Sequence, residues 1–161
     1  MLKSNRTKKV SARGCQFVIV ASKYNARYVN AMLNAAQAEL KRAGARVRVV
    51  RVPGAYEIPV VASRLANAAI VQPESSEAQV AAIICLGVIL RGQTVHAEHI
   101  GRAVSDALMS ISIRCEIPVI HEVLLLENEE QARVRCLGKE FNRGTEAAQT
   151  ALEMAAVMSG L

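Results

Sequence analysis

The apolar run from Val80 to Leu90 constrains the fold more than any other feature of this chain, because its eleven residues include no charged side chain. A run that is apolar on both faces predicts a strand buried on both sides, which is typical of a parallel sheet covered by helices. The run stops at Arg91-Gly92, and Gln93-Thr94 then opens a helical pattern. Such a turn, at the carboxyl end of a strand, is where open α/β sheets carry ligand sites.

Strand-like and helical patterns alternate along the rest of the chain. Short apolar runs predict three further strands, over residues 16–21, 47–52 and 118–126, the last opened by a proline that a strand start tolerates. Apolar residues at helical spacing predict helices over residues 29–40, with Gly44 as the C-cap, and over 57–70, 100–111 and 144–158. Asn128 is expected to cap a short helix that reaches Cys136, and residues 72–77 are expected to form a surface loop.

The alternation of strands and helices predicts one domain over residues 15–161, and a chain of 161 residues is of single-domain length. Hydrophobic residues make up 52% of the chain but aromatic residues only 3%, so the core must consist of Ala, Val, Ile and Leu. We expect an α/β fold of the flavodoxin-like, doubly wound type: a three-layer αβα sandwich around a single four-stranded parallel sheet.

The net charge of +6 is concentrated at the N-terminus. Of the 20 basic residues, five lie within the first thirteen positions, which hold no acid, so the remainder carries 15 basic against all 14 acidic residues. We expect residues 1–14 to form a mobile basic arm. Because the rest of the chain is nearly neutral, no nucleic-acid partner is expected for the folded part, and the arm is the alternative site for one.

Neither a membrane protein nor a secreted protein is indicated. The N-terminus has no apolar signal core, and no apolar run reaches the roughly 18 residues of a membrane span. The four cysteines, at positions 15, 85, 115 and 136, form no C-x-x-C pair. Buried thiols in a reducing compartment are therefore the better interpretation, and we expect a cytoplasmic protein.

Four loops that follow the predicted strands are expected to meet at one rim of the sheet: residues 22–25, 53–57, 91–94 and 127–128. In the third loop, Gly92 and the free N–H groups of the helix start can hold an anion, and Thr94 adds a hydroxyl donor. His96 lies in the first turn of the helix, and histidine titrates near neutral pH. The segment predicts an anion pocket with a proton-transfer group beside it.

Several side chains near this rim have two interpretations. Tyr24 either stacks on a flat heterocycle or covers the rim, and Asn25 either bonds a ligand or caps a helix. Glu57 either accepts hydrogen bonds from sugar-like hydroxyls or caps a helix. His96 and His99 share a helix face and could bind a metal, but the sequence offers no third ligand and no H-E-x-x-H pattern, so no metal is expected.

Together these motifs resemble the lumazine synthase family. The resemblance covers residues 17–157 and rests on these segments: Tyr24-Asn25, Val52–Pro59, Leu86–His96, Pro118–Ile120, Glu130–Ala132, Arg135, Asn142–Gly144 and Ala151–Ala155. It implies a transferase that condenses 5-amino-6-(D-ribitylamino)uracil with 3,4-dihydroxy-2-butanone 4-phosphate. The products are 6,7-dimethyl-8-ribityllumazine, phosphate and water, in the penultimate step of riboflavin biosynthesis, with no cofactor.

The resemblance also implies an assembly and roles for single residues. The assembly is a homopentamer with active sites between neighbouring subunits, and twelve such pentamers often form a 60-subunit icosahedral shell. Whether riboflavin synthase associates with the assembly stays open. His96 is the implied acid–base, and Arg135 of the neighbouring subunit binds the phosphate with Gln93 and Thr94. Tyr24 is implied to stack on the pyrimidine, and the backbone of Ile89 and Leu90 to contact the uracil. The implied contacts with the ribityl chain come from Asn25, Ala55, Tyr56 and Glu57. Gly92 belongs to the implied phosphate loop.

The chain departs from the family pattern at positions that would face a substrate. Arg143 stands where a lysine commonly meets a uracil carbonyl. His121-Glu122 stands where Phe-Gly is common, so His121 makes the wall contributed by the neighbour more polar. These departures keep a second class of function open, namely a binding or shell protein that holds a flavin-like ligand without catalysis.

Overall fold

The computed structural model describes residues 11–71, 80–138 and 141–161, which contain one four-stranded sheet. Its strands are β1 (Gln16–Ser22), β2 (Arg46–Val52), β3 (Val80–Leu90) and β4 (Val119–Leu126), in the spatial order β2-β1-β3-β4. All the pairings are parallel, and β3 pairs with both β1 and β4. The predicted parallel sheet is confirmed, and the long apolar run is one of its interior strands.

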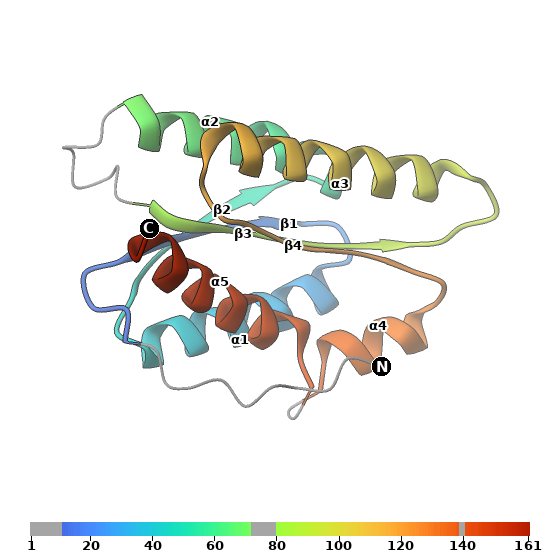
Figure 1. Cartoon of the computed structure of the whole chain (residues 1–161). Helices are drawn as coiled ribbons and strands as arrows, with labels where there is room; N and C mark the ends of the chain where they lie inside the picture. Colours follow the sequence, from blue (N-terminus) through green and yellow to red (C-terminus); the bar gives the residue numbers. More distant parts are fainter. Residues whose placement is uncertain (1–10, 72–79, 139–140) are drawn as a thin grey trace.

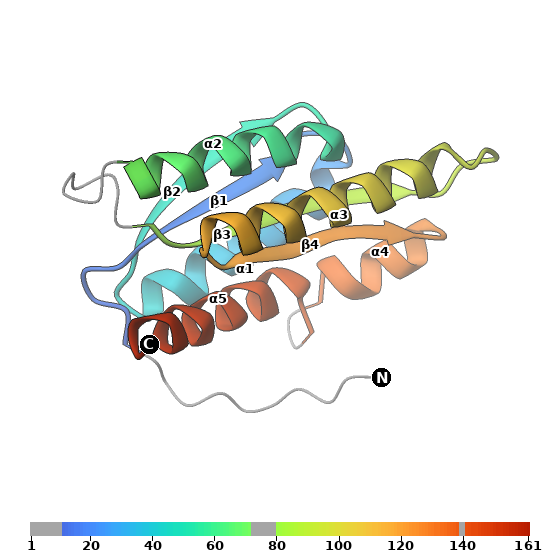
Figure 2. The ribbon, with the colours of Figure 1, turned by 45° about the horizontal axis from the view of Figure 1, so that its top comes forward.

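Helices cover both faces of the sheet (Figure 1). α2 (Ile58–Val71) and α3 (His96–Cys115) lie on one face, and α1 (Ala26–Arg42), α4 (Glu129–Cys136) and α5 (Arg143–Ser159) lie on the other. One turn of 3-10 helix, η1 (Ala55–Glu57), precedes α2, so the helix predicted from residue 57 begins one residue later. Figure 2, turned toward α2 and α3, shows the strands running behind these two helices. The predicted three-layer αβα sandwich is confirmed.

β3 is buried on both faces because each face meets its own layer of helices. Ile84 and Leu86 belong to the core shared with α1 and α5, whereas Ile83 and Cys85 belong to the core shared with α2 and α3. Besides Phe17 and Tyr28, the first of these cores contains fully buried alanines: Ala36, Ala147, Ala148 and Ala151. Such small side chains let α1 and α5 pack closely on each other.

Two helix ends lie close to their predicted signals. α1 ends with Ala43 at the C-cap position, and the predicted C-cap Gly44 follows it, with a φ of 82° in the left-handed region that favours glycine. The side chain of Asn128 accepts a hydrogen bond from the N–H of Gln131 at 2.9 Å and so caps α4. Asn142 caps α5 by accepting from the N–H of Gly144 at 2.9 Å, and its Nδ2 donates to the carbonyl of Cys136 at 2.6 Å. Asn142 therefore ties the end of α4 to the start of α5.

The predicted N-terminal arm is described only from Ser11. Ala12 is buried, and its N–H donates to the carbonyl of Ala43 at 2.9 Å, so the folded domain includes this residue. Residues 1–10 of the arm and the predicted loop over 72–77 lie outside the described residues. Across the part of the chain that the structure describes, no helix has the length and apolar character to cross a membrane.

The four cysteines are free and lie apart from one another in the fold. Cys85 and Cys136 are buried as predicted, whereas Cys15 and Cys115 are only partly buried. Burial raises the pKa of the Cys136 thiol to about 11, so this thiol stays protonated near neutral pH.

Candidate active site

A cleft of about 1110 Å³ lies at the carboxyl ends of β1 and β3, between η1 and the first half of α3. Ten of the sequence-predicted site residues line it: Tyr24, Asn25, Ala55, Tyr56, Glu57, Ile89, Leu90, Gly92, Thr94 and His96. Three of the four predicted loops therefore meet here. The fourth, over residues 127–128, does not line the cleft.

The turn at Gly54 builds one wall of the cleft. Glu57 Oε2 accepts a hydrogen bond from the N–H of Gly54 at 2.8 Å and so closes η1. A Cβ on Gly54 would lie 2.9 Å from this oxygen and equally close to Cδ2 of Tyr24, so any larger residue here would displace one of these two side chains. Of the two interpretations of Glu57, the structure shows capping of the turn. The second carboxylate oxygen, Oε1, takes no part in that bond.

The side chains beside this turn are open to a ligand. Tyr24 and Tyr56 are 69% and 62% exposed, and rings so exposed can stack on a flat ligand. Asn25 stands at the N-cap position of α1 with a φ of 54°, but its side chain makes no cap. Its Nδ2 instead donates to the carbonyl of Val88 at 2.7 Å. This bond joins the start of α1 to the end of β3 inside the cleft.

The predicted anion loop is exposed and is held at its base by Arg91. The N–H of Arg91 donates to the carbonyl of Leu126 at 2.8 Å, and its guanidinium pairs with Glu127 at 2.9 Å and with Glu98. Gly92 is not crowded, since a Cβ placed there would meet no atom within 4 Å. The loop is therefore anchored at one end and open along its length.

His96 is the first residue of α3, and its side chain is exposed at the cleft. Its backbone N–H lies 3.4 Å from Thr94 Oγ1, to which it donates, and Val95 holds the N-cap position. Unpaired backbone N–H groups at a helix start attract anions. The arrangement places a histidine at this helix start, while Gln93 is exposed on the loop and does not line the cleft.

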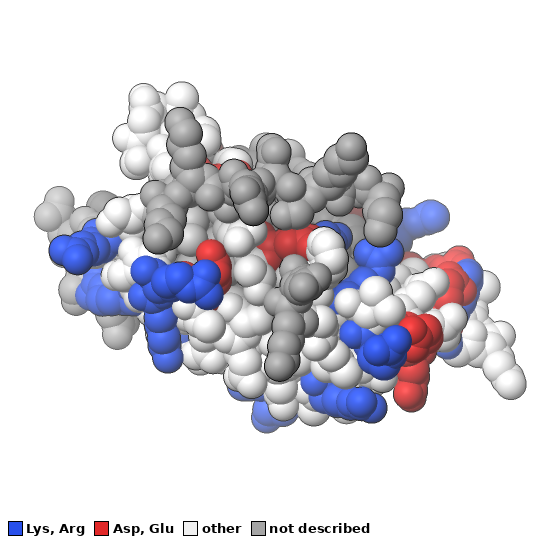
Figure 3. All heavy atoms as spheres, turned by 90° about the horizontal axis from the view of Figure 1, so that it is seen from below, with Lys and Arg blue, Asp and Glu red and all other residues white. Residues whose placement is uncertain are grey.

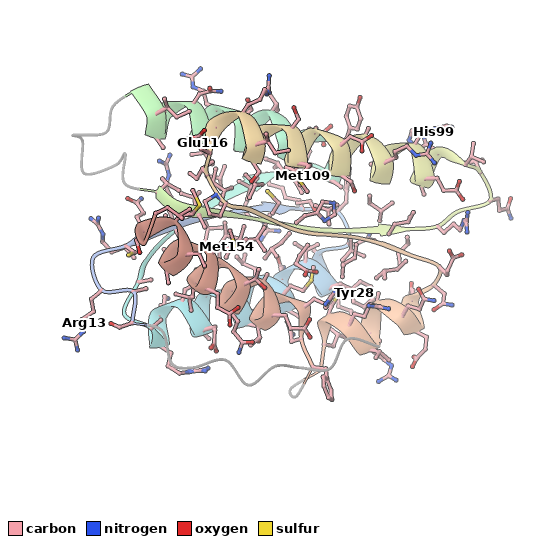
Figure 4. All side chains as sticks on the ribbon, in the orientation of Figure 1. Arg13, Tyr28, His99, Met109, Glu116 and Met154 are labelled. Carbon is pink, nitrogen blue, oxygen red and sulfur yellow. The ribbon has the colours of Figure 1, made fainter. Side chains whose placement is uncertain are left out.

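Three predicted site residues lie away from the cleft. Arg135 is exposed on α4, and Arg143 begins α5, so both lie across the sheet from α3. Figure 4 shows the same separation between His99 on α3 and Tyr28, whose hydroxyl lies 3.4 Å from Glu129 of α4. His121 is exposed on β4, with Nε2 2.8 Å from Ser105 Oγ of α3. One chain therefore does not bring Arg135 or Arg143 to His96.

A second polar cluster surrounds Glu122 on the α5 side of β4. Glu122 is only 9% exposed, and its Oε2 lies 3.4 Å from Nε of Arg143. Nη1 of Arg143 pairs with Glu146 at 2.5 Å. Burial raises the pKa of Glu122 to about 7, against the opposing effect of Arg143. Figure 3 shows the face below, where basic and acidic side chains lie next to each other.

The comparisons with known proteins give one answer. A family model described as 6,7-dimethyl-8-ribityllumazine synthase matches residues 14–159. The chain belongs to the lumazine synthase family. It is 40% identical over 146 residues to the 6,7-dimethyl-8-ribityllumazine synthase of Xanthomonas campestris pv. campestris (strain B100), covering 89% of each chain. It is also 40% identical over 151 residues to the enzyme of that name from Xylella fastidiosa (strain M12), covering 92% of each chain.

Sequence reasoning missed part of the cleft of this lumazine synthase family member. Ala97, His99, Ile100 and Ala103 of α3 also line it. Ile100 and Ala103 belong to the apolar stripe that predicted the helix over residues 100–111, so the same stripe could have indicated a cleft wall. Among the described residues, His96 and His99 belong to no group of three or more His, Cys, Asp or Glu that could hold a metal ion.

Proposed function

We propose that this chain is a 6,7-dimethyl-8-ribityllumazine synthase, which condenses 5-amino-6-(D-ribitylamino)uracil with 3,4-dihydroxy-2-butanone 4-phosphate and releases phosphate and water. The observation that carries the proposal is the cleft, which joins two exposed tyrosines and an open anion loop to His96. The exposed tyrosines suit a flat pyrimidine, the open loop suits a leaving phosphate, and His96 suits the proton transfers between them. The names of the relatives point to the same reaction.

The proposed roles follow from the chemistry of the steps. The amine of one substrate attacks the carbonyl of the other and water leaves, phosphate is then eliminated, and closure of the ring releases a second water. Tyr24 stacks on the pyrimidine, while Glu57 Oε1 and Asn25 meet ribityl hydroxyls. Thr94 and the helix start take the phosphate, and His96 moves protons between the reacting atoms. Much of the remaining acceleration comes from holding two substrates together.

We infer that the working form is a homopentamer, or a 60-subunit shell, with sites between subunits. Arg135 and Arg143 lie across the sheet from the cleft, so only a second copy can bring them to it. Apolar side chains on α2 and α3 are available for that contact, since Val60, Met109 and Ile113 are 69%, 63% and 68% exposed. A shell of this kind is also where an association with riboflavin synthase would occur. The partly buried free thiols are consistent with a cytoplasmic location.

Light scattering distinguishes these assemblies. At 17.4 kDa per chain, a pentamer has a mass of about 87 kDa and a shell about 1 MDa. A monomer at micromolar concentration would contradict the proposed intersubunit site.

The direct test of the proposed activity is an assay with both substrates. The purified protein, checked for folding by circular dichroism, should form the lumazine product, which is followed by its absorbance and fluorescence. A folded and assembled protein that gives no product above the uncatalysed rate would overturn the proposal.

Replacing Arg135 by alanine should raise KM for the butanone phosphate by roughly ten- to a hundredfold, because charged hydrogen bonds to the phosphate are lost. KM for the uracil substrate should change much less. Steady-state kinetics with each substrate varied in turn gives both values. Since Arg135 is exposed on α4, the melting temperature should stay near that of the unchanged protein.

Mixed oligomers test whether Arg135 comes from the neighbour. When Arg135→Ala and His96→Ala chains are co-expressed, random assembly leaves about one interface in four with both residues intact. The mixture should therefore be more active than either variant alone. If both residues served the same chain's site, every site in the mixture would lack one of them and no activity would return.

A second candidate function is ligand binding without catalysis. The observation that favours it is the ion pair of buried Glu122 with Arg143, which places charged groups on the side of the sheet across from the cleft. Tight binding of the lumazine product together with no turnover of the two substrates would support this alternative.

A further inference from the structure

The carboxylate of Glu122 is the one strongly buried acid of β4, and the proposed mechanism does not use it. Its residue is 9% exposed, and its Oε2 forms no hydrogen bond among the described residues although Arg143 Nε lies 3.4 Å away. A buried acid has a high free-energy cost unless it is paired with a cation. The contact with Arg143 is therefore expected to stabilise the observed orientation of both side chains.

Two of the three nitrogens of Arg143 contact acids. Nη1 donates a hydrogen bond to Glu146 at 2.5 Å, Nε lies 3.4 Å from Glu122 in an ion pair without a hydrogen bond, and neither contact uses Nη2. The guanidinium is planar and rigid, so the hydrogen bond at Nη1 and the ion pair at Nε together restrict the direction of Nη2. The side chain is 28% exposed, which leaves part of its edge available to a ligand.

We propose that Glu122 is a positioning residue for Arg143, holding the guanidinium so that Nη2 presents a fixed donor to the uracil substrate bound by the neighbouring subunit. This inference rests on the proposed function, in which Arg143 is a substrate contact. Glu122 itself touches no substrate. Its effect therefore falls on the binding of the uracil substrate and not on the chemical step.

The charged and titratable groups around Glu122 belong to two helices. Arg143 and Glu146 face it from α5, and Arg135 and Cys136 face it from α4. From β3 its register neighbour is the apolar Leu86. Burial raises the pKa of Glu122 to about 7, so the carboxylate is lost as the pH falls through that value. The ion pair between Glu122 and Arg143 should weaken when the carboxylate is protonated.

The test compares Glu122→Gln with the unchanged protein across pH. At pH 8 the variant should show a KM for ribitylaminouracil about tenfold higher, with kcat and the KM for butanone phosphate little changed. In the unchanged protein this KM should rise as the pH drops below about 7, and in Glu122→Gln that rise should be absent. Glu130→Gln, which breaks the exposed pair with Arg133, is the matched control.

A double-mutant cycle separates positioning from a general loss of structure. In an Arg143→Ala background, Glu122→Gln should cause no further change in KM, because the residue through which it acts is gone. Equilibrium titration with the lumazine product repeats the comparison without turnover. Equal KM and product affinity in Glu122→Gln and the unchanged protein, or additive effects in the cycle, would overturn the inference. An unchanged protein without turnover would instead overturn the proposed function.

Discussion

Replacing His96 by alanine is expected to lower turnover of the two substrates by about a hundredfold or more, because a positioned acid–base group contributes roughly 10²–10⁴-fold to proton transfer. The side chain is exposed at the start of α3, so little folding energy depends on it. Stability, measured as the melting temperature, should therefore stay close to that of the unchanged protein. The measurement is kcat with both substrates saturating.

A second variant separates proton transfer from simple contact. Glutamine at position 96 keeps a hydrogen-bonding side chain of similar reach but cannot exchange a proton near neutral pH. His96→Gln should therefore be nearly as slow as His96→Ala. If both variants turned over at the unchanged rate, His96 would have no part in the chemistry; if only the glutamine variant did, its part would be contact alone.

The sheet could be predicted from sequence because its central strand carries its own signal. Val80–Leu90 is apolar on both faces, and only a strand between two helical layers buries both. Asn128 caps α4 and Gly44 directly follows the C-cap of α1, so local backbone chemistry indicated both helix ends. Convergence of the loops after β1, β2 and β3 follows from parallel strands sharing one rim.

The candidate site could be predicted only in part, for physical reasons that differ between residues. Glu57 could serve a ligand or a turn, and only coordinates reveal that Oε2 meets the N–H of Gly54. Asn25 takes the cap position, yet its side chain reaches Val88, 63 residues away in sequence, which no local pattern encodes. Loop 127–128 follows the edge strand β4 and supports Arg91 from outside the cleft.

Arg135 and Arg143 show a further limit of prediction from the sequence. Sequence spacing places Arg135 on a helix and Arg143 just before one, but it cannot say which face of the sheet those helices cover. The structure puts α4 and α5 on the face opposite the cleft, so spacing within one chain carries no information on the distance between Arg135 and His96 in an assembly. That distance depends on how subunits dock, which is why the mixed-oligomer experiment is needed.

Replacing Gly144 by alanine is expected to cost about 3 kcal/mol or more of folding free energy, at the upper end of overpacking effects. A Cβ at this position would lie 1.9 Å from the carbonyl oxygen of Met32 and 2.6 Å from its Cα. These are backbone atoms of α1, so no side chain can move aside to make room. The start of α5 would have to separate from α1 and open the alanine-lined core between them.

A glycine in another helix provides the control. A Cβ on Gly101 of α3 would meet Leu125 at 3.5 Å, an ordinary contact, and alanine favours the helix by about 1 kcal/mol over glycine. Gly101→Ala should therefore be neutral or stabilising, whereas Gly144→Ala should lower the midpoint of chemical unfolding strongly. Because Arg143 precedes Gly144, the displaced helix start should also weaken binding of the lumazine product. Equal unfolding midpoints for the two alanine variants would mean that α1 and α5 do not pack as closely as the structure places them.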